Sequence, residues 1–430
     1  MIRSKLRLGT AVLAAAALGL ASCASPDEGG EAAAEDVPGI TETTVTVGTH
    51  QPLTGPAAAG YSTISPATKA YFDYVNDNGG VNGRTIEYIV KDDGYNPANT
   101  QTAVREMVLQ DEVFALVGGL GTPPHSAVLD FVNDNEVPDL FVASGSPTWN
   151  QPEDYPYTYG FMVDYPTESR ILATYAQEEF PDKTYCFFGQ DDDFGEEFQA
   201  GLEAVLGEDG LADAQVYSTA NTDIAAQISS MKEAGCEVNF LATINGFSAQ
   251  AVGTAAKLGY FPQWMASSAG GDFNTLSGYL GENTDKLLQG FVSANYLPGY
   301  SDTEDEWTAK FSEINEEYNA GAPFDGNTIF GMSIGYLFVE ALQAAGENPT
   351  RESLMEALES GDVTGNGHAP LGFGGDSHRG YTGAMLTRVD NGVQSYFGTP
   401  YVVTGTESEE YTVEEYTGER PAMPADGLPE

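Results

Sequence analysis

ALVGGLGTP, residues 115–123, is the stretch of sequence that sets the fold class. Its first three residues form a short apolar run typical of a buried strand, and its glycines let the backbone turn and approach another group closely. Thr122 can cap a helix, and Pro123 suits the first helical position. A strand, a glycine turn and a helix start in direct succession predict an α/β fold with a mainly parallel sheet.

The same alternation of apolar runs and helical periodicity extends in both directions from this stretch. A second, similar series begins after a cluster of prolines and tyrosines at 155–165, and two Rossmann-like series predict two lobes. Asn391-Gly392 marks the turn of a late hairpin. The predicted strands are 45–48, 86–90, 115–117, 140–142, 185–188, 215–218, 238–242, 385–389 and 393–397.

The N-terminal segment, residues 1–22, is predicted to be an export signal. Arg3, Lys5 and Arg7 form a basic start, and 8–20 is apolar but too short to span a bilayer. Residues 20–23, Leu-Ala-Ser-Cys, resemble a bacterial lipobox, so Cys23 is the expected lipidation site; a cleaved signal with a coincidental cysteine is the alternative. Residues 23–43 are then expected to be a flexible tether.

The composition argues against nucleic-acid binding and against a bound metal or cofactor. The net charge is −47, and such a surface repels nucleic acid. Four histidines show no zinc-ligand spacing, so neither a metal nor a cofactor is expected. In an oxidising compartment Cys186 and Cys236 are compatible with a disulfide and equally with two buried thiols.

Two loops offer the groups that bind a small anion. Both 118–123 and 143–147 follow predicted strands, where open α/β sheets bind their ligands. Hydroxyls and backbone N–H groups of these loops could grip a carboxylate. The alternative for each loop is ordinary turn and cap chemistry. The candidate residues are Gly121, Thr122, Ser144, Gly145 and Ser146.

Several motifs together resemble the LivJ-like, branched-chain amino acid type of solute-binding protein of ABC transporters. The motifs are QPLTGP at 51–56, NGGVNGR at 78–84, Asp92-Asp93, GGLGT at 118–122 and Val137-Pro138, and the similarity runs from about 44 to about 403. The resemblance implies a type I periplasmic-binding fold with two Rossmann-like lobes joined by three crossovers, placed near Tyr165, Val292 and Gly374. The lobes would be 44–165 with 293–374, and 166–292 with 375–430.

The resemblance also implies ligand contacts. In amino-acid-binding relatives the ligand carboxylate is held by the two loops, here Thr122 and Ser144 to Ser146. The ammonium usually meets an acidic residue in the segment that here reads 264–270, around Ser268, and no acid stands there. An α-amino acid ligand is therefore in doubt, because a desolvated ammonium requires an anionic partner. The acids that could substitute are Asp191, Asp192, Asp193 and Asp272.

Aromatic residues after predicted strands are expected to contact the apolar part of a ligand. Tyr61, Phe194, Phe247 and Tyr296 are the aromatic candidates, and Asn245 and Ser268 are further candidate ligand contacts. Ordinary packing is the alternative for each of them.

These observations predict a lipoprotein on the outer face of the cytoplasmic membrane, anchored through Cys23 and monomeric in its mature domain. It would capture a small amino acid or a related aromatic or aliphatic carboxylate for the permease of an ABC importer. A sensory receptor is one alternative, and a secreted hydrolase another. GMSIG at 331–335 matches a nucleophile elbow, but it lies within a helical run, so no enzyme activity is expected.

Overall fold

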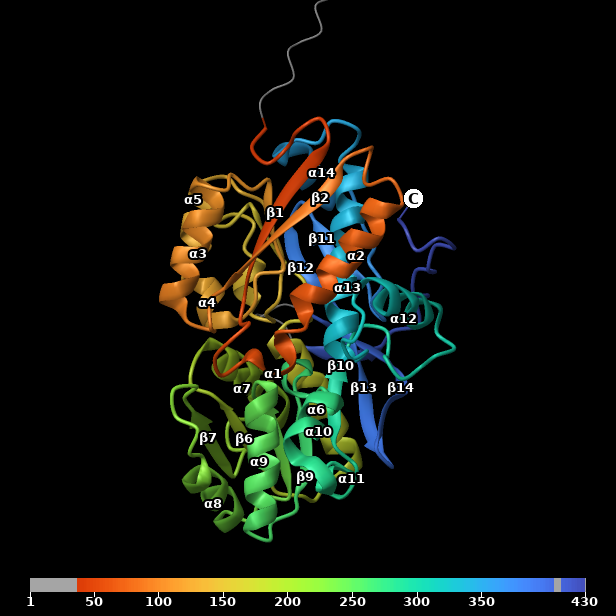
Figure 1. Cartoon of the computed structure of the whole chain (residues 1–430). Helices are drawn as coiled ribbons and strands as arrows, with labels where there is room; N and C mark the ends of the chain where they lie inside the picture. Colours follow the sequence, from red (N-terminus) through yellow and green to blue (C-terminus); the bar gives the residue numbers. More distant parts are fainter. Residues whose placement is uncertain (1–36, 406–410, 430) are drawn as a thin grey trace, which may run out of the picture. The chain divides into compact units, whose positions relative to one another are not determined.

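Two large β-sheets, together with a separate two-stranded sheet, organise the chain in the computed structural model, which describes residues 37–405 and 411–429 (Figure 1). The predicted export signal and Cys23 lie outside the described residues. The predicted tether ends earlier than expected, because residues 37–43 pack on the first lobe: Val37 and Ile40 contact its core, and Thr46 N donates to Gly39 O.

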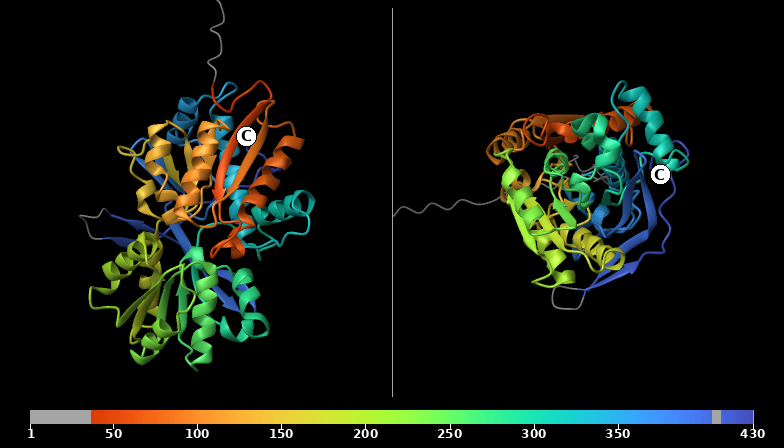
Figure 2. Two further views of the ribbon diagram at one scale, coloured as in Figure 1. Left: turned by 60° about the vertical axis from the view of Figure 1, so that its left-hand side comes forward. Right: turned by 90° about the horizontal axis from the view of Figure 1, so that it is seen from below.

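The first sheet is entirely parallel, with strand order β2-β1-β3-β4-β5. β1 and β3 are buried because helices cover both faces (Figure 2). Gly331 of α13 permits close packing on α2, since a Cβ at Gly331 would lie 2.2 Å from Ile64 O. The elements are β1 Thr44–Gln51, α1 Ala58–Tyr61, α2 Ile64–Asp77, β2 Thr85–Asp92, α3 Pro97–Leu109, β3 Ala115–Val117, α4 Thr122–Ser126, α5 Leu129–Asp134, β4 Asp139–Val142, η1 Pro147–Trp149 and β5 Thr158–Gly160.

The second sheet has the order β15-β14-β13-β10-β9-β8-β6-β7, parallel from β7 to β10 and antiparallel beyond. Alternate residues of β6 enter different cores: Phe187 belongs to the same core as Phe198 of α7, and Phe188 belongs to another core together with Val252 of α9. The elements are α6 Tyr165–Glu179, β6 Tyr185–Gln190, α7 Asp193–Leu206, β7 Asp213–Tyr217, α8 Ala225–Glu233, β8 Val238–Ala242, α9 Asn245–Lys257, β9 Gln263–Ala266, η2 Ser268–Gly270, α10 Phe273–Leu280, η3 Gly281–Asn283, α11 Thr284–Leu287 and β10 Val292–Asn295.

The C-terminal third serves both lobes. The hairpin of β13 and β14 turns at Asn391 and Gly392, whose φ angles of 52° and 77° confirm the predicted turn. α13 packs on α2 in the first lobe. The elements are α12 Glu306–Tyr318, α13 Gly326–Ala344, α14 Arg351–Glu359, β11 Leu371–Gly374, β12 Ser377–Tyr381, β13 Gly383–Asp390, β14 Val393–Thr404 and β15 Thr412–Glu415.

The chain passes between the lobes later than two of the expected crossovers. β10 at 292–295 belongs to the second sheet, and β12 at 377–381 packs beside β5 of the first lobe. The tail expected in the second lobe also returns to the first, where Tyr71 OH donates to Gly427 O at 2.8 Å and Trp307 Nε1 donates to Pro421 O at 2.8 Å. Side-chain hydrogen bonds between distant segments decide these boundaries, and sequence periodicity does not register them.

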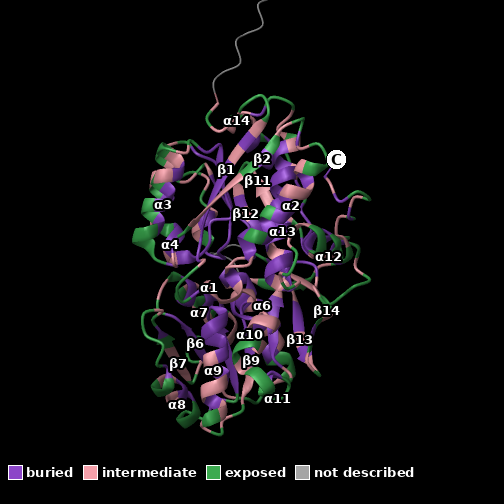
Figure 3. Cartoon of the chain, viewed as in Figure 1, coloured by how far each residue is buried: buried purple, intermediate pink, exposed green. Residues whose placement is uncertain are grey.

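Buried residues form continuous cores inside both lobes (Figure 3). Cys186 of β6 and Cys236 are joined by a disulfide, with their Cα atoms 5.7 Å apart, so the structure selects one of the two arrangements that the sequence left open. Within residues 37–405 and 411–429, each helix is too short or too polar to cross a membrane.

Candidate ligand-binding cleft

A pocket of about 1000 Å³, including the part open to solvent, lies between the two lobes. The first lobe contributes residues that follow β1, β2, β3 and β4, together with the start of α13. The second lobe contributes residues that follow β6, β8, β9 and β10, together with β14. The first-lobe lining includes Tyr61, Tyr95, Gly121, Ala143, Asn327 and Phe330, and the second-lobe lining includes Phe194, Ile244, Ser268, Asp272, Tyr296 and Tyr396.

Aromatic rings dominate the walls of this pocket. Of the predicted wall residues, Tyr61, Phe194 and Tyr296 line it. Tyr165, which the sequence marked only as a crossover, also lines it and packs on Phe194 with ring centroids 4.3 Å apart. The predicted Phe247 does not line it: its ring stacks on Tyr217 at 4.0 Å in the core of the second lobe. The pocket therefore suits a solute with an apolar body.

The hydroxyls of the two predicted loops lie behind the pocket wall. Thr122 Oγ1 and Ser144 Oγ are 2.7 Å apart, and Tyr165 OH is 3.3 Å from the first and 3.4 Å from the second. Gly121 lines the pocket in front of them. Gly145 packs against Tyr165, whose N donates to Gly145 O at 2.7 Å. In this arrangement the two hydroxyls bond to each other, and Tyr165 separates them from the main pocket.

Ser146 connects the lobes. Its hydroxyl donates to Glu197 Oε1 of α7 at 2.7 Å, and it lines a second pocket of about 280 Å³ together with Ser144. Burial raises the pKa of the Glu197 carboxyl to about 8, with the Ser146 hydrogen bond acting in the opposite direction. Burial against Ser146 therefore favours the protonated, uncharged form of this carboxyl.

Further hydrogen bonds cross the cleft. Tyr61 OH donates to Ala269 O, and Gln190 Nε2 donates to Tyr95 OH at 3.3 Å. Gly326 N of α13 donates to Asp272 Oδ2 at 3.3 Å. The structure thus shows the two lobes closed on the pocket.

The acidic residues considered as ammonium partners have different environments. Asp191 and Asp193 are exposed. Asp192 caps α7 by accepting from Phe194 N. Asp272 lines the pocket and caps α10. The backbone N–H of Asp272 donates to Oδ1 of the predicted residue Asn245 at 3.2 Å.

Asp272 also lies close to a second buried acid. Asp325 caps α13, and burial together with the Asp272 charge raises its pKa to about 6. Burial likewise raises the pKa of Asp272. Closing the lobes therefore brings two like charges together, which favours a protonated form of the pair.

A buried chain of hydrogen-bonded side chains packs against the loop at 118–121. Asp93 Oδ2 lies 2.8 Å from His50 Nδ1, His50 Nε2 lies 3.0 Å from His125 Nδ1, and His125 Nε2 lies 2.8 Å from Asp139 Oδ2. All four residues are fully buried. A Cβ at Gly119 would lie 2.6 Å from His50 Nε2, so only glycine lets the loop rest on this chain. No local sequence signal predicts this pairing, because His50 and His125 meet only in the folded chain.

We also searched the described residues for a metal site and for the serine nucleophile that the GMSIG motif suggests. No group of three or more His, Cys, Asp or Glu side chains among them could hold a metal ion. Ser333 is buried inside α13 and accepts from Asn366 Nδ2 at 2.9 Å. The helical setting of Ser333 confirms that the GMSIG match is not a nucleophile elbow.

Known proteins share this sequence pattern and fold. Residues 44–394 match the family model described as periplasmic binding protein. Leu/Ile/Val-binding protein homolog 3 of Brucella melitensis is 24% identical over 237 residues, which are 54% of this chain and 59% of that protein. The chain thus matches about three fifths of the length of this curated relative.

Solved structures agree in fold. A branched-chain amino acid ABC transporter structure from Thermus thermophilus with bound valine has a TM-score of 0.74 and 20% identity, over 84% of this chain and 97% of the other. A fatty acid ABC transporter substrate-binding protein from Thermomonospora curvata has a TM-score of 0.74 and 21% identity, over 86% of this chain and 95% of the other. The predicted α/β fold with two lobes and the LivJ-like resemblance are confirmed. The relatives are solute-binding proteins and not enzymes, and the match over 44–394 shows that the chain belongs to the periplasmic binding protein family.

Proposed function

We propose that this protein captures a small amino acid or a related organic carboxylate outside the cell and delivers it to an ABC importer. The observation that carries the proposal is the aromatic pocket enclosed by both lobes. A pocket that closes around its ligand converts binding into a change of shape that a permease can recognise. The names of the valine-bound and fatty-acid-transporter relatives support the same role.

The proposal includes export and attachment to the membrane through Cys23. The basic start, the apolar run and the lipobox-like residues 20–23 support it. Metabolic labelling with a radioactive fatty acid tests it: the wild-type chain should become labelled and a Cys23→Ala variant should not. Release of an unlabelled wild-type chain into the medium would contradict the anchor.

A thermal-shift panel tests solute binding. The panel contains branched-chain and aromatic amino acids, aliphatic and aromatic carboxylates, and inorganic phosphate as the negative control. A ligand raises the melting temperature by mass action, so members that fit the pocket should raise it in proportion to the logarithm of their concentration. Calorimetry should then give one solute per chain and no turnover. Formation of product would support a hydrolase instead, and a panel without any shift would contradict the proposal.

A further inference from the structure

Three polar atoms near one wall of the main pocket lack a hydrogen-bond partner among the described residues. They are Glu168 Oε1, Ser268 Oγ and Tyr296 OH. Glu168 is 0% exposed and Tyr296 is 1% exposed. Leaving such groups unsatisfied in a buried site is unfavourable, because each group loses its hydrogen bonds to water without gaining another partner. Ser268 and Tyr296 line the pocket, so a polar group of a bound solute can reach unpartnered atoms at this wall.

Three elements bring these atoms together. Glu168 lies in the first turn of α6, Ser268 begins η2, and Tyr296 follows β10; α6 and η2 both pack on β10. Glu168 Oε2 accepts from Ser267 Oγ at 2.6 Å and from Ser268 N at 3.3 Å. The Ser268 hydroxyl faces the same carboxylate without forming a hydrogen bond of good geometry. The second oxygen of Glu168 therefore remains available.

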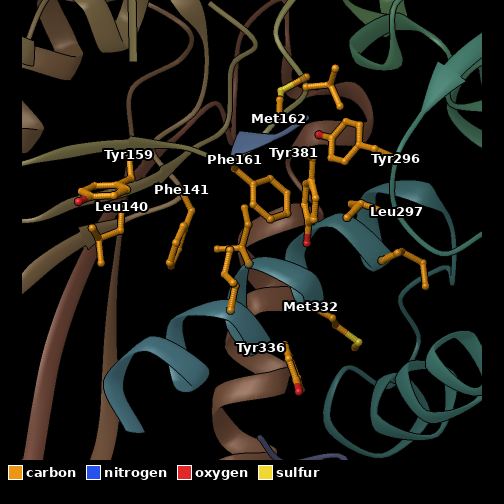
Figure 4. Close-up of a cluster of buried hydrophobic side chains, with 14 of the residues drawn as sticks. Leu140, Phe141, Tyr159, Phe161, Met162, Tyr296, Leu297, Met332, Tyr336 and Tyr381 are labelled. Carbon is orange, nitrogen blue, oxygen red and sulfur yellow. The ribbon is translucent and has the colours of Figure 1, made fainter. Parts of the chain in front are cut away.

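Tyr296 is held firmly in this wall. Its ring packs against Tyr381 and Phe161, with centroids 5.3 Å and 6.1 Å away (Figure 4). Its pKa is raised first by burial and then by the charge of Glu168, which places the phenol and the carboxylate in one electrostatic environment. Ser268 and Tyr296 both line the pocket.

Other acids near the pocket are already engaged. Asp272 Oδ1 accepts from Thr275 N and Thr275 Oγ1, and Asp272 Oδ2 accepts from Gly326 N. Asp192 accepts from Phe194 N and from Gln190 Nε2. Glu197 retains an unpartnered oxygen, but its hydrogen bond goes to Ser146, which lines the smaller pocket. Glu168 does not itself line the main pocket, but it keeps an unpartnered oxygen and accepts from the N–H of Ser268, which does line it.

We propose that Glu168, with the hydroxyls of Ser268 and Tyr296, recognises a protonated amino group of the solute. The proposal rests on the proposed function and specifies its substrate class. An ammonium group carries three N–H donors, which match three unpartnered acceptors. No Lys, Arg or His side chain is among the residues that line the pocket, so nothing there repels a cation. Tyrosine faces add cation–π attraction.

Glu168 supplies the acid that segment 264–270 lacks, but from a different element. The carboxylate arrives from α6 and bonds to Ser267 and Ser268 of that very segment. The segment has no acid in its own sequence, but the folded chain places the Glu168 carboxylate against it.

Binding of an amine beside Glu168 should release a proton from the Glu168 carboxyl, and this release can be measured. Burial raises the pKa of the Glu168 carboxyl to about 7, and an adjacent ammonium lowers the pKa of a carboxyl. An amine that binds at pH 7 should therefore displace about half a proton, because the group is half protonated when pH equals pKa. A ligand without an amino group should displace none from this residue.

The experiment compares three isosteric probes on the full-length chain by calorimetry in buffers of different ionisation enthalpy. Leucine has both charged groups, isoamylamine has only the ammonium, and 4-methylpentanoate has only the carboxylate. We expect Glu168→Gln to weaken leucine and isoamylamine binding by about 10- to 100-fold and to abolish proton release. The affinity for 4-methylpentanoate should not fall. Glu179→Gln, on an exposed position of the same helix, is the matched control and should change nothing.

Ser268→Ala is the second variant, because it removes one acceptor and leaves Glu168 in place. It should weaken the two amines by about 3- to 10-fold and spare 4-methylpentanoate. Equal leucine affinity in wild type and Glu168→Gln would overturn the proposal. Binding of 4-methylpentanoate without binding of either amine would overturn it too, while leaving solute capture intact. If none of the three binds, the amine assignment fails, and the wider panel decides solute capture separately.

Discussion

Tyr296 and Tyr381 pack ring against ring, 5.3 Å apart, although they belong to different segments that connect the lobes. Phe161, beside the remaining segment, lies 5.5 Å from Tyr381, and its O accepts from Tyr381 N at 3.1 Å. All three connections between the lobes therefore share one buried aromatic cluster (Figure 4). Bending at one connection must be accommodated by the other two.

Truncating this cluster should destabilise the whole protein. We expect Tyr381→Ala to lower the free energy of unfolding by about 3–5 kcal/mol, because it leaves a cavity in a packed core. Urea unfolding followed by fluorescence measures the change. Phe261→Ala removes an aromatic ring that is 63% exposed and should cost less than about 0.5 kcal/mol. An equal loss in the free energy of unfolding for the two variants would show that the aromatic cluster contributes no more to stability than an exposed ring.

Removing one hydroxyl should weaken lobe closure. Tyr61 OH donates to Ala269 O across the cleft, and a neutral hydrogen bond contributes about 0.5–1.5 kcal/mol. We expect Tyr61→Phe to weaken binding of a solute found in the panel by about 2- to 10-fold in calorimetry. Tyr74→Phe loses a comparable bond, to Asp426 O, far from the cleft and serves as the control. A loss of affinity in the control alone would contradict the assignment.

Glu197 should make stability depend on pH. Its pKa rises from 4.5 to about 8 in the folded chain, mainly through burial. Below pH 4.5 the carboxyl is protonated in both states and has no effect. As pH rises from 4.5 to 8 the unfolded chain loses this proton more readily, so the free energy of unfolding falls.

The matched variants isolate this contribution. Glu197→Gln cannot ionise, and we expect its melting temperature to exceed that of wild type at pH 8.5 by more than at pH 5. Glu196→Gln, at an exposed neighbouring position, should follow wild type at both values. A constant difference between Glu197→Gln and wild type across this range would refute the effect.

Reduction should destabilise the second lobe. The disulfide between Cys186 and Cys236 closes a loop of sequence separation 50, for which chain entropy predicts about 4 kcal/mol. We expect a reductant to lower the melting temperature of wild type and not that of a Cys186→Ser, Cys236→Ser double variant. An unchanged wild-type transition after complete reduction, confirmed by thiol titration, would contradict this expectation.

Local sequence signals predicted the fold well. The strand and glycine turn at 115–123, the Asn391-Gly392 hairpin and two alternating series are features of short segments, and backbone preferences decide them locally. The pocket-lining positions of Tyr61, Gly121, Phe194, Ser268 and Tyr296 follow from the rule that loops after strands meet at one sheet edge.

The sequence by itself thus determined two lobes, the loops that face the cleft and the absence of an acid between 264 and 270. Only the tertiary structure showed that Glu168 reaches that segment, that Phe247 turns into the core, and that Tyr165 covers Thr122 and Ser144. The physical reason is that periodicity tells which face of an element is buried. Which side chains from distant elements meet there depends on how helices and sheets pack, and no local preference encodes it.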